Sequence, residues 1–326
     1  MLTDQTLSNK STKYCIHICV LCMIIAFIYS FNIHEVISYK FLRTVYPPVA
    51  IRKKNNCTVI VHNPLGRLGN VLFEFASAYG LSLEHSCHLY IGPNLIEELN
   101  KTFEINLSDL LTKSELNRTS PIQQIYNHCT YFPELFKPNT SQHIELTGYW
   151  QAEKHFRNQT DQIREQLRFR PIVLDSVKNF TQIVMKNTSK TLVGVHIRRG
   201  DFVGQRTISS DQFIFNAMDY FTRKYNSTYF ILLSDDKEYI RKTFGKRNDT
   251  FFTPNSFTAT QDMALLTLCD HLIITVGTYG WWGGYLLHNR TGEVLTDSKP
   301  NHEPVDVGCQ GSVFFPPSFK FLNSTG

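Results

Sequence analysis

The sequence predicts an α/β protein with parallel sheets, preceded by a single transmembrane helix. Short β-branched and apolar runs alternate with segments of helical periodicity along most of the chain, which is typical of βαβ units. A stretch of 18 residues without a formal charge, 14–31, lies near the N-terminus. Thirteen Asn-x-Ser/Thr triplets, twelve of them after that stretch, indicate a surface that meets the glycosylation machinery of the secretory pathway.

The apolar stretch 14–31 approaches the about 20 residues that a helix needs to cross a bilayer. Lys10 and Lys13 precede it, and this positive flank predicts that residues 1–13 stay in the cytoplasm while the rest enters the lumen. A cleaved signal peptide is the alternative, but its apolar region is shorter, about 7–15 residues, and small residues follow it. Residues 32–56 show no sustained period and are predicted to form a stem.

Composition narrows the function classes. The net charge of +5 is mild, and the largest basic run is Arg52–Lys54, which argues against a nucleic-acid partner.

The predicted lumenal glycosylation sites are Asn56, Asn100, Asn106, Asn117, Asn139, Asn158, Asn179, Asn187, Asn226, Asn248, Asn289 and Asn323.

Five cysteines would be lumenal, and the other three lie in the predicted anchor. An odd number allows at most two intramolecular disulfides and leaves one thiol over. Their wide spacing does not suggest a metal site, and the pairing stays open. The five are Cys57, Cys87, Cys129, Cys269 and Cys309.

The elements of the first lumenal half follow from period and length. A β-branched run predicts a strand at 58–62, and apolar residues at helical spacing predict a helix over 70–83. A second strand is expected at 88–91, while residues 95–143 carry only weak signals. The remaining elements are a strand at 144–147 and helices at 162–167 and 174–185.

The second half alternates more clearly. Strands are expected over 192–197, 229–233, 272–275 and 293–296. Helices are expected over 210–225, 236–244, 260–269 and 281–288. Ligands of such sheets bind at the carboxyl ends of the strands, so those ends are where site residues should be sought.

The strand 192–197 runs directly into His196-Ile-Arg198-Arg199-Gly-Asp201. Two adjacent guanidinium groups are costly to bury, and their planar forks suit bidentate contacts with phosphate. Arg198 shares a strand face with His196 and is expected to reach the cleft. Arg199 is then expected to pair with Asp201 or with a neighbouring helix. A structural salt bridge at the end of the strand explains the same residues and stays open.

Asp235 and Asp236 follow the next strand. At least one of them is expected to cap the following helix, as Asp often does. The other is a candidate acceptor for the N1–H and amino group of guanine.

The turn Gly277-Thr278-Tyr279 lies between a strand and a helix. Backbone N–H groups and the positive end of the helix dipole make such a turn an anion site, which would fit a diphosphate. The alternative is a tight turn closed by helix packing. Trp281 and Trp282 are expected in the core.

Several segments resemble a known family. His196–Asp201 resembles the donor motif of fucosyltransferases that use GDP-fucose. Residues 262–286, 66–70 with the following helix, and 147–156 are similar to segments of the α1,2-fucosyltransferase family. Together these segments span nearly all of the lumenal region, and the longest of them is the most specific.

The resemblance implies a GT-B-like fold of two Rossmann-like halves, with an acceptor-side lobe at 57–190 and a donor-side lobe at 191–326. It implies transfer of L-fucose from GDP-β-L-fucose to O2 of a terminal β-galactose, with inversion and without a metal. Together with the predicted anchor, we expect a type II protein of the Golgi membrane. By motif match, Arg198 would contact the β-phosphate and His196 would support the nucleotide. The other implied donor-side residues are Arg199, Asp235, Asp236, Gly277, Thr278 and Tyr279, and the acceptor or cleft residues are Gly69, Asn70, Tyr149 and Gln151.

The catalytic base cannot be carried over. A related α1,6 class has a glutamate eight residues after the first arginine of the motif, where this chain has Arg206. Asp201 is the first candidate because it lies beside Arg198, and Glu153 is the second. A path in which the departing phosphate takes the proton stays open.

No Asp-x-Asp triplet is present to hold a divalent cation against a diphosphate, so no metal and no cofactor are expected. Arginine and backbone N–H groups must then neutralise the phosphates. A protein O-fucosyltransferase is the alternative enzyme. A sugar-binding receptor is the alternative without catalysis, but it would have no need for adjacent arginines at a strand end.

Overall fold

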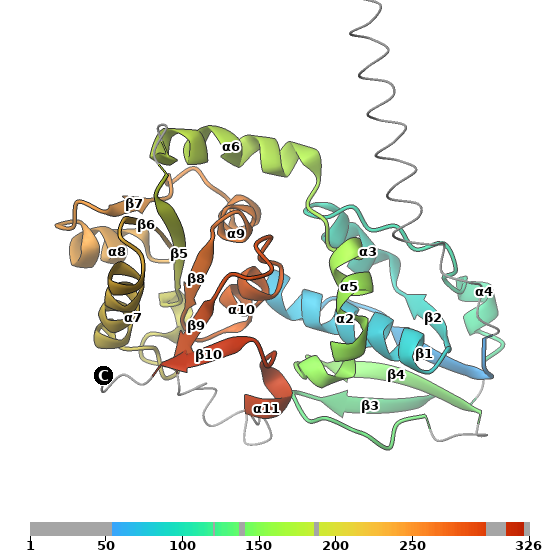
Figure 1. Cartoon of the computed structure of the whole chain (residues 1–326). Helices are drawn as coiled ribbons and strands as arrows, with labels where there is room; N and C mark the ends of the chain where they lie inside the picture. The colour runs from blue at the N-terminus through green and yellow to red at the C-terminus, as the bar shows by residue number, and fades with distance from the viewer. Residues whose placement is uncertain (1–53, 120, 137–140, 186–188, 298–310, 323–326) are drawn as a thin grey trace, which may run out of the picture. The chain divides into compact units, whose positions relative to one another are not determined.

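The computed structural model describes residues 54–119, 121–136, 141–185, 189–297 and 311–322 (Figure 1). Lys54–Gly326 form one compact unit. The predicted cytoplasmic tail, membrane anchor and most of the stem lie outside the described residues. Within the described ranges, no helix is both long and apolar enough to cross a membrane.

The first half of the unit contains a four-stranded parallel sheet with the order β2-β1-β4-β3. Its strands are β1 (Cys57–Val61), β2 (His88–Ile91), β3 (Gln123–Asn127) and β4 (Gln142–Gly148). One face of this sheet, which includes Val59, Leu89 and Ile144, packs against the long helix α2 (Leu68–Glu84). β3 is an edge strand and was not predicted.

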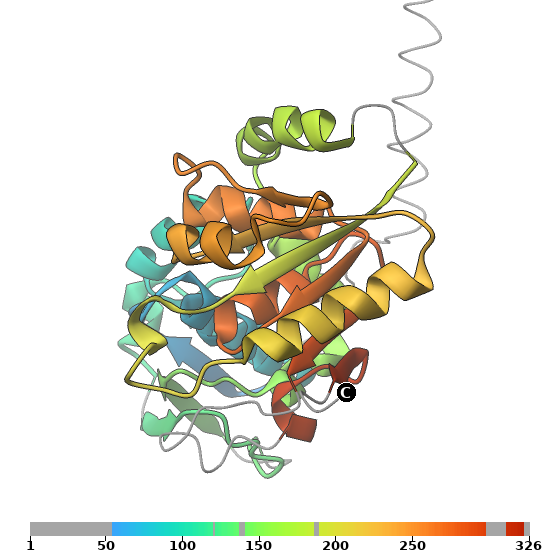
Figure 2. The ribbon, with the colours of Figure 1, turned by 90° about the vertical axis from the view of Figure 1, so that its left-hand side faces the viewer.

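The second half contains a six-stranded parallel sheet with the order β10-β9-β8-β5-β6-β7. Both faces are covered, as is usual for all-parallel sheets. Phe230 and Leu232 face the core shared with α7 and α8, whereas Ile231 and Leu233 face the core shared with α9 and α10. Figure 2 shows α7 in front of the sheet, running roughly alongside the strands. The elements are β5 (Thr191–Ile197), α7 (Asp211–Lys224), β6 (Thr228–Ser234), α8 (Lys237–Phe244), β7 (Thr250–Phe252), α9 (Ala259–Thr267), β8 (His271–Ile274), α10 (Thr278–Tyr285), β9 (Val294–Asp297) and β10 (Phe319–Leu322).

The two sheets share one hydrophobic core, which runs through α2 and α10. The ring of Phe73 lies 4.4 Å from that of Trp281 and 5.1 Å from that of Trp282. Gly69 allows the two helix starts to meet, because a Cβ there would lie 2.9 Å from the backbone of Thr278. The expected burial of both tryptophans is confirmed.

Two of the remaining helices, α6 and α11, pack against the half to which they do not belong in sequence. α6, which the sequence places before residue 191, packs against α9 of the second half, and α11 packs against η1 near the first sheet. These elements are α3 (Pro93–Asn100), α4 (Lys113–Leu116), η1 (Glu153–His155), η2 (Arg157–Gln159), α5 (Thr160–Gln166), α6 (Pro171–Met185), η3 (Gly200–Phe202) and α11 (Gly311–Phe314). The prediction of an α/β fold with parallel sheets is confirmed.

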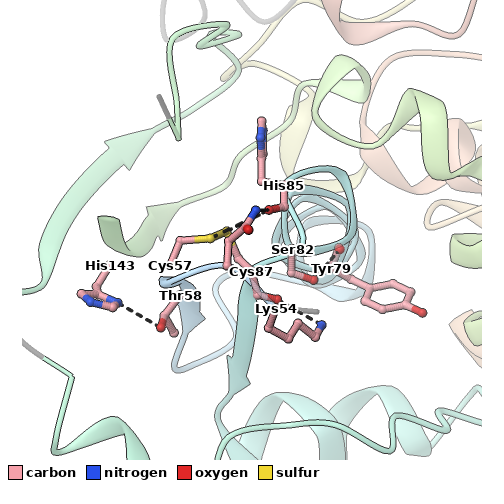
Figure 3. The surroundings of a disulfide bond; sticks show 9 residues. Lys54, Cys57, Thr58, Tyr79, Ser82, His85, Cys87 and His143 are labelled. Atoms are coloured by element: carbon pink, nitrogen blue, oxygen red, sulfur yellow. Dashed lines mark hydrogen bonds between the residues drawn. A yellow bond between two sulfur atoms is a disulfide. The ribbon is translucent and has the colours of Figure 1, made fainter. Parts of the chain in front are cut away.

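One disulfide joins Cys57 to Cys87, and so ties the first residue of β1 to the residue before β2 (Figure 3). Cys129 also belongs to a disulfide. Among the described residues Cys269 is a free, buried thiol, which agrees with the leftover thiol expected from the odd count. Cys309 lies outside the described residues.

The predicted glycosylation sites fall into three groups. Asn100 and Asn289 are half-buried, and each makes hydrogen bonds within the protein. Asn139, Asn187 and Asn323 lie outside the described residues. The exposed sites are Asn56, Asn106, Asn117, Asn158, Asn179, Asn226 and Asn248.

Candidate active site

A cleft of about 860 Å³ lies where β5, β6 and β8 end and where α2 begins. This is the edge at which parallel strands present their carboxyl ends, so the expected location is confirmed. The predicted site residues that line it are Gly69, Asn70, Tyr149, Gln151, His196, Arg198, Asp201, Asp235, Gly277, Thr278 and Tyr279. Arg199, Asp236 and Glu153 do not line it.

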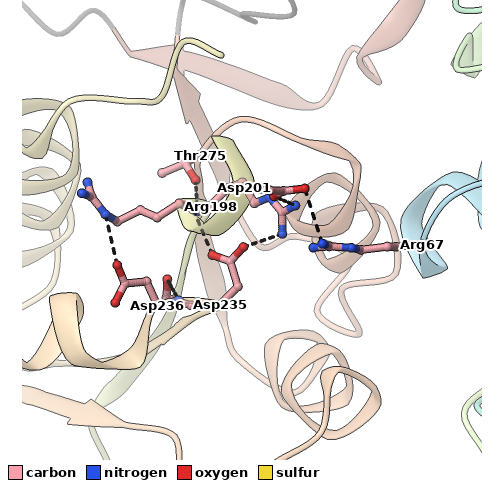
Figure 4. A network of polar contacts seen from close by, with 8 residues as sticks. Arg67, Arg198, Asp201, Asp235, Asp236 and Thr275 are labelled. Carbon is pink, nitrogen blue, oxygen red and sulfur yellow. Dashed lines mark hydrogen bonds and ion pairs between the residues drawn. The ribbon is translucent and has the colours of Figure 1, made fainter. Parts of the chain in front are cut away.

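Arg198 lies at the centre of an ionic network (Figure 4). Its Nη1 donates to Asp235 Oδ2 at 2.6 Å, and its Nη2 donates to Asp201 Oδ1. Its backbone N–H donates to Thr275 Oγ1 at 2.8 Å, which fixes the end of β5 against β8. A guanidinium has five N–H donors, so three remain for a ligand.

The network extends to the first half of the chain through Arg67, whose Nη2 lies 3.4 Å from Asp201 Oδ2. Asp201 therefore bridges two guanidinium groups that come from different halves of the molecule. Arg67 was not singled out in the sequence, although it belongs to the segment 66–70 that resembles the family.

Arg199 points away from the cleft, as the alternation along the strand predicted. Its Nε lies 3.7 Å from Asp236 Oδ2, and its guanidinium lies 3.5 Å from the ring centroid of Tyr239 on α8. Of the two expected partners, it therefore takes the neighbouring helix, while Asp201 pairs with Arg198 instead.

The two aspartates after β6 have separate structural tasks. Asp236 caps α8, because its side chain accepts a hydrogen bond from the backbone of Tyr239. Asp235 accepts from the backbone N–H of Arg199 at 2.9 Å as well as from Arg198. Both carboxylates are thus engaged within the protein, and the guanine contact expected of one of them stays a prediction.

A third carboxylate, Asp262 on α9, lines the same cleft and was not assigned a role from the sequence. It is 6% exposed, and its Oδ2 lies 3.3 Å from Nζ of Lys237. Burial raises its pKa, and the charge of Lys237 opposes that rise. Oδ1 and the neighbouring Thr253 hydroxyl are both buried, and the contact of Asp262 with Thr253 also opposes the rise in its pKa.

His196 is 4% exposed and lies against α10, with its ring 5.1 Å from that of Tyr279. Burial, together with the charge of Arg198, lowers the pKa of His196 to about 3. The imidazole is therefore neutral at physiological pH, and it packs beside Arg198 without adding to its charge.

Gly277 is the N-cap of α10 with a φ of 97°, a left-handed conformation that favours glycine. Thr278 follows and donates from Oγ1 to Asn70 Oδ1 at 2.9 Å. The same Asn70 oxygen accepts from Gln151 Nε2 at 3.1 Å. Asn70 therefore joins the start of α2, the segment after β4 and the predicted diphosphate turn.

Glu153, the second candidate base, is 2% exposed and ion-paired with Arg157 at 2.5 Å. Burial raises the pKa of Glu153 to about 7, although Arg157 opposes the rise. The structure does not bring this carboxyl group into the cleft. Its buried position in η1 follows from the neighbouring core, which the sequence pattern did not reveal.

Other lining residues were also missed. They share no motif, because folding brings them to the cleft from turns and helix faces. They include His128, Phe202, Lys237 and Arg241, and also Arg206 at the position of the glutamate in the α1,6 class. Among the described residues, no group of three His, Cys, Asp or Glu side chains is arranged to hold a metal ion.

Residues 34–307 match the model of glycosyl transferase family 11. Galactoside alpha-(1,2)-fucosyltransferase 2 of Bos taurus is 30% identical over 268 residues, which cover 78% of this chain and 76% of that protein. Galactoside 2-alpha-L-fucosyltransferase SEC1 of Bos taurus is 29% identical over 278 residues, which cover 81% and 72%.

Among solved structures, fucosyltransferase NodZ from Bradyrhizobium is similar with a TM-score of 0.44 and 15% identity, covering 71% of this chain and 92% of that one. A mutant of Arabidopsis thaliana FUT1 in complex with GDP is similar with a TM-score of 0.48 and 13% identity, covering 82% and 78%. The family match spans most of the chain and includes every residue that lines the cleft. The chain therefore belongs to glycosyl transferase family 11.

Proposed function

We propose that this protein transfers L-fucose from GDP-β-L-fucose to O2 of a terminal β-galactose on a glycan, with inversion and without a metal ion. The observation that carries the proposal is Arg198, held by two carboxylates in a cleft with three N–H donors left. The names of the two bovine relatives support galactose as the acceptor.

The diphosphate of the donor fits the space between Arg198 and the first turn of α10. Arg67 and Arg206 also line the cleft and add positive charge to it. The backbone N–H groups after Gly277 and the positive end of the α10 dipole complete an anion site. These groups offset part of the diphosphate charge without a cation, since Asp201 and Asp235 already balance part of the charge of Arg198 and Arg67.

The guanine base fits beside Asp262. Asp262 lines the cleft, and a carboxylate is a natural acceptor for the N1–H and amino group of guanine. Asp262 therefore takes the role that the sequence had suggested for Asp235 or Asp236.

The reaction is a single displacement at the anomeric carbon of fucose. The O2 atom of galactose forms a bond to C1, and the bond from C1 to the β-phosphate oxygen breaks, so that the β-linked donor gives an α-linked product. The negative charge that develops on the departing GDP is stabilised by Arg198 and the α10 turn.

The proton of the galactose hydroxyl must leave in the same reaction. Among the described residues four carboxyl groups line the cleft, those of Asp201, Asp235, Glu238 and Asp262. Asp201 is 46% exposed and has ion-pair partners that also face the donor. It remains our candidate base, and the departing phosphate is the other acceptor of the proton.

We also propose that the protein is a single-pass type II protein of the Golgi membrane. The apolar stretch 14–31 and the exposed Asn-x-Ser/Thr sites support this location. Mass mapping of the mature protein tests it: the N-terminal peptides should be retained and unglycosylated, and a mature N-terminus near Asn32 would contradict the anchor.

The activity is tested with the full-length protein in membranes, GDP-fucose, and lactose or a folded peptide domain as the acceptor. We expect GDP release with lactose and an α1,2-linked product by NMR, unchanged by EDTA. Transfer only to the peptide domain would identify a protein O-fucosyltransferase instead. A strict Mn²⁺ requirement would contradict the metal-independent donor site.

A further inference from the structure

The first sheet has an open face that continues the cleft. Among the described residues, one face of this sheet packs on α2, and only part of the other is covered, by Leu116 of α4 over Ile60 and Tyr90. β3 forms the edge of the sheet, and its side chains alternate between the two faces. Tyr126 and His128 are two residues apart and thus share the open face.

Three rings on this face form a continuous row from the solvent into the cleft. Tyr126 is 65% exposed. Its ring meets that of His128 edge to face, at 5.2 Å and 88°, and its Oη shares a hydrogen bond with His128 Nε2 at 2.9 Å. The ring of His128 lies 5.4 Å from that of Tyr149. His128 and Tyr149 both line the cleft, so the row, here called the aromatic platform, is continuous with the proposed acceptor side.

The backbone beneath the aromatic platform is held in place. Tyr149 N donates to Asn127 O at 2.8 Å, and Gln151 N donates to His128 O at 2.5 Å. The side chain of Asn127 closes the turn after β3, because it bonds to both the N–H and the C=O of Thr130. The rings are therefore positioned before any ligand arrives, which lowers the entropic cost of binding.

The chemistry of the platform suits a sugar. An exposed tyrosine ring offers a flat apolar surface with a negative face, which attracts the C–H bonds on the apolar side of a pyranose ring. Polar groups that can form hydrogen bonds with hydroxyls lie beside it on the same face. Gln124, two residues before Tyr126 on β3, donates to Glu145 Oε2 at 2.8 Å. A protein partner would be expected to meet a larger apolar area than one exposed ring.

We infer that the aromatic platform binds the second sugar of the acceptor, the residue to which the terminal galactose is attached. The inference rests on the proposed function, because it takes the galactose to lie in the cleft beside Gln151 and Tyr149. The acceptor is then an oligosaccharide of at least two sugars, and Tyr126 contributes to its affinity without touching the donor.

The test compares methyl β-galactoside, lactose and N-acetyllactosamine as acceptors for the full-length protein at saturating GDP-fucose. Tyr126→Ala should raise the KM for the two disaccharides about tenfold, the scale of a lost aromatic contact. It should leave kcat, the KM for methyl β-galactoside and the KM for GDP-fucose unchanged. Tyr126→Phe keeps the ring and should retain most of the disaccharide affinity.

Phe321→Ala is the matched control, because Phe321 is a 48% exposed aromatic residue on β10, the edge of the other sheet. It should change none of these constants. An equal rise in KM for methyl β-galactoside, or no rise for any acceptor, would overturn the platform. A wild-type protein that hydrolyses GDP-fucose but fucosylates no galactoside would instead overturn the proposed function, and the platform with it.

Discussion

Arg198 combines a rigid position with free hydrogen-bonding capacity. Asp235 and Asp201 each hold one of its terminal nitrogens. A charge-assisted contact of this kind is worth about 1.5–3 kcal/mol, and more where charge develops away from water. We therefore expect Arg198→Ala to reduce kcat by at least about 100-fold. Arg198→Lys should restore only part of the activity, because an ammonium group cannot reproduce the planar fork.

Arg199 provides the comparison for this prediction. It stacks on Tyr239 and pairs with Asp236, outside the cleft. Arg199→Ala should therefore lower the melting temperature more than Arg198→Ala does, while affecting the KM for GDP-fucose less. Circular dichroism and secretion levels should be measured beside activity. A misfolded Arg198→Ala protein would mean that the arginine serves the fold and not the donor.

Asp262 offers a second prediction at the scale of a single side chain. If its carboxylate accepts from the guanine amino group, GDP should inhibit the wild type more strongly than IDP, which lacks that amino group. Asp262→Asn should raise the inhibition constant of GDP about tenfold or more and reduce the preference for GDP over IDP. Inhibition constants for both nucleotides check the prediction, and an unchanged GDP to IDP ratio in the variant would contradict it.

At the scale of an element, α2 carries a buried carboxyl group that supports the start of the helix. Both oxygens of Glu74 lie 3.1 Å from the backbone N–H of Leu65, which precedes Gly66 and Arg67 at the rim of the cleft. Burial raises the pKa of Glu74 to about 8, although this hydrogen bond opposes the rise. The side chain is therefore protonated in the folded protein at neutral pH.

The raised pKa of Glu74 makes stability depend on pH. Below the ordinary pKa of about 4.5, both the folded and the unfolded chain hold the proton. Between about 4.5 and about 8 only the folded chain holds it, so the free energy of unfolding falls as the pH rises. Glu153, with a pKa of about 7, adds to the fall in the lower part of that range.

We expect Glu74→Gln to remove much of this fall, because the amide oxygen can still accept from Leu65 and carries no titrating proton. Melting temperatures at pH 7 and 8, above the ordinary pKa of the buried histidines, should decrease in the wild type and decrease less in the variant. Glu84→Gln is a suitable control, since Glu84 is the exposed last residue of the same helix. Parallel curves for the wild type and Glu74→Gln would show that Glu74 is not the titrating group.

The elements also differ in how well they could be predicted from the sequence. The second sheet was predictable because β5, β6 and β8 are buried on both faces and are continuous apolar runs. β3 was missed because Gln123, Gln124 and Asn127 break the apolar alternation on an exposed edge. The residues that line the cleft differ in the same respect. Arg198 was predictable from its place at a strand end, whereas Asp262 and His128 reach the cleft only through tertiary packing.

At the scale of the whole molecule, the two sheets cannot separate without opening the aromatic core around α2 and α10. Phe73 alone contacts Trp281, Trp282, Phe156 and Phe314. We therefore expect residues 54–326 to unfold in one cooperative step. Far-ultraviolet circular dichroism and tryptophan fluorescence should give coincident denaturation curves. Phe73→Ala should lower the free energy of unfolding by about 3–5 kcal/mol and shift both curves together. A second transition would contradict a shared core.

The buried thiol of Cys269 follows from the same packing. Its Sγ lies 3.4 Å from Leu265 O, and burial raises its pKa, so an alkylating reagent can reach a reactive thiolate only when the core opens. The rate at which Cys269 is alkylated therefore reports how often the core opens. Peptide mapping would measure this alkylation rate. A nucleotide that binds only the closed state would lower the rate by the factor 1 + [L]/Kd. Donor affinity could then be measured in variants that no longer catalyse anything.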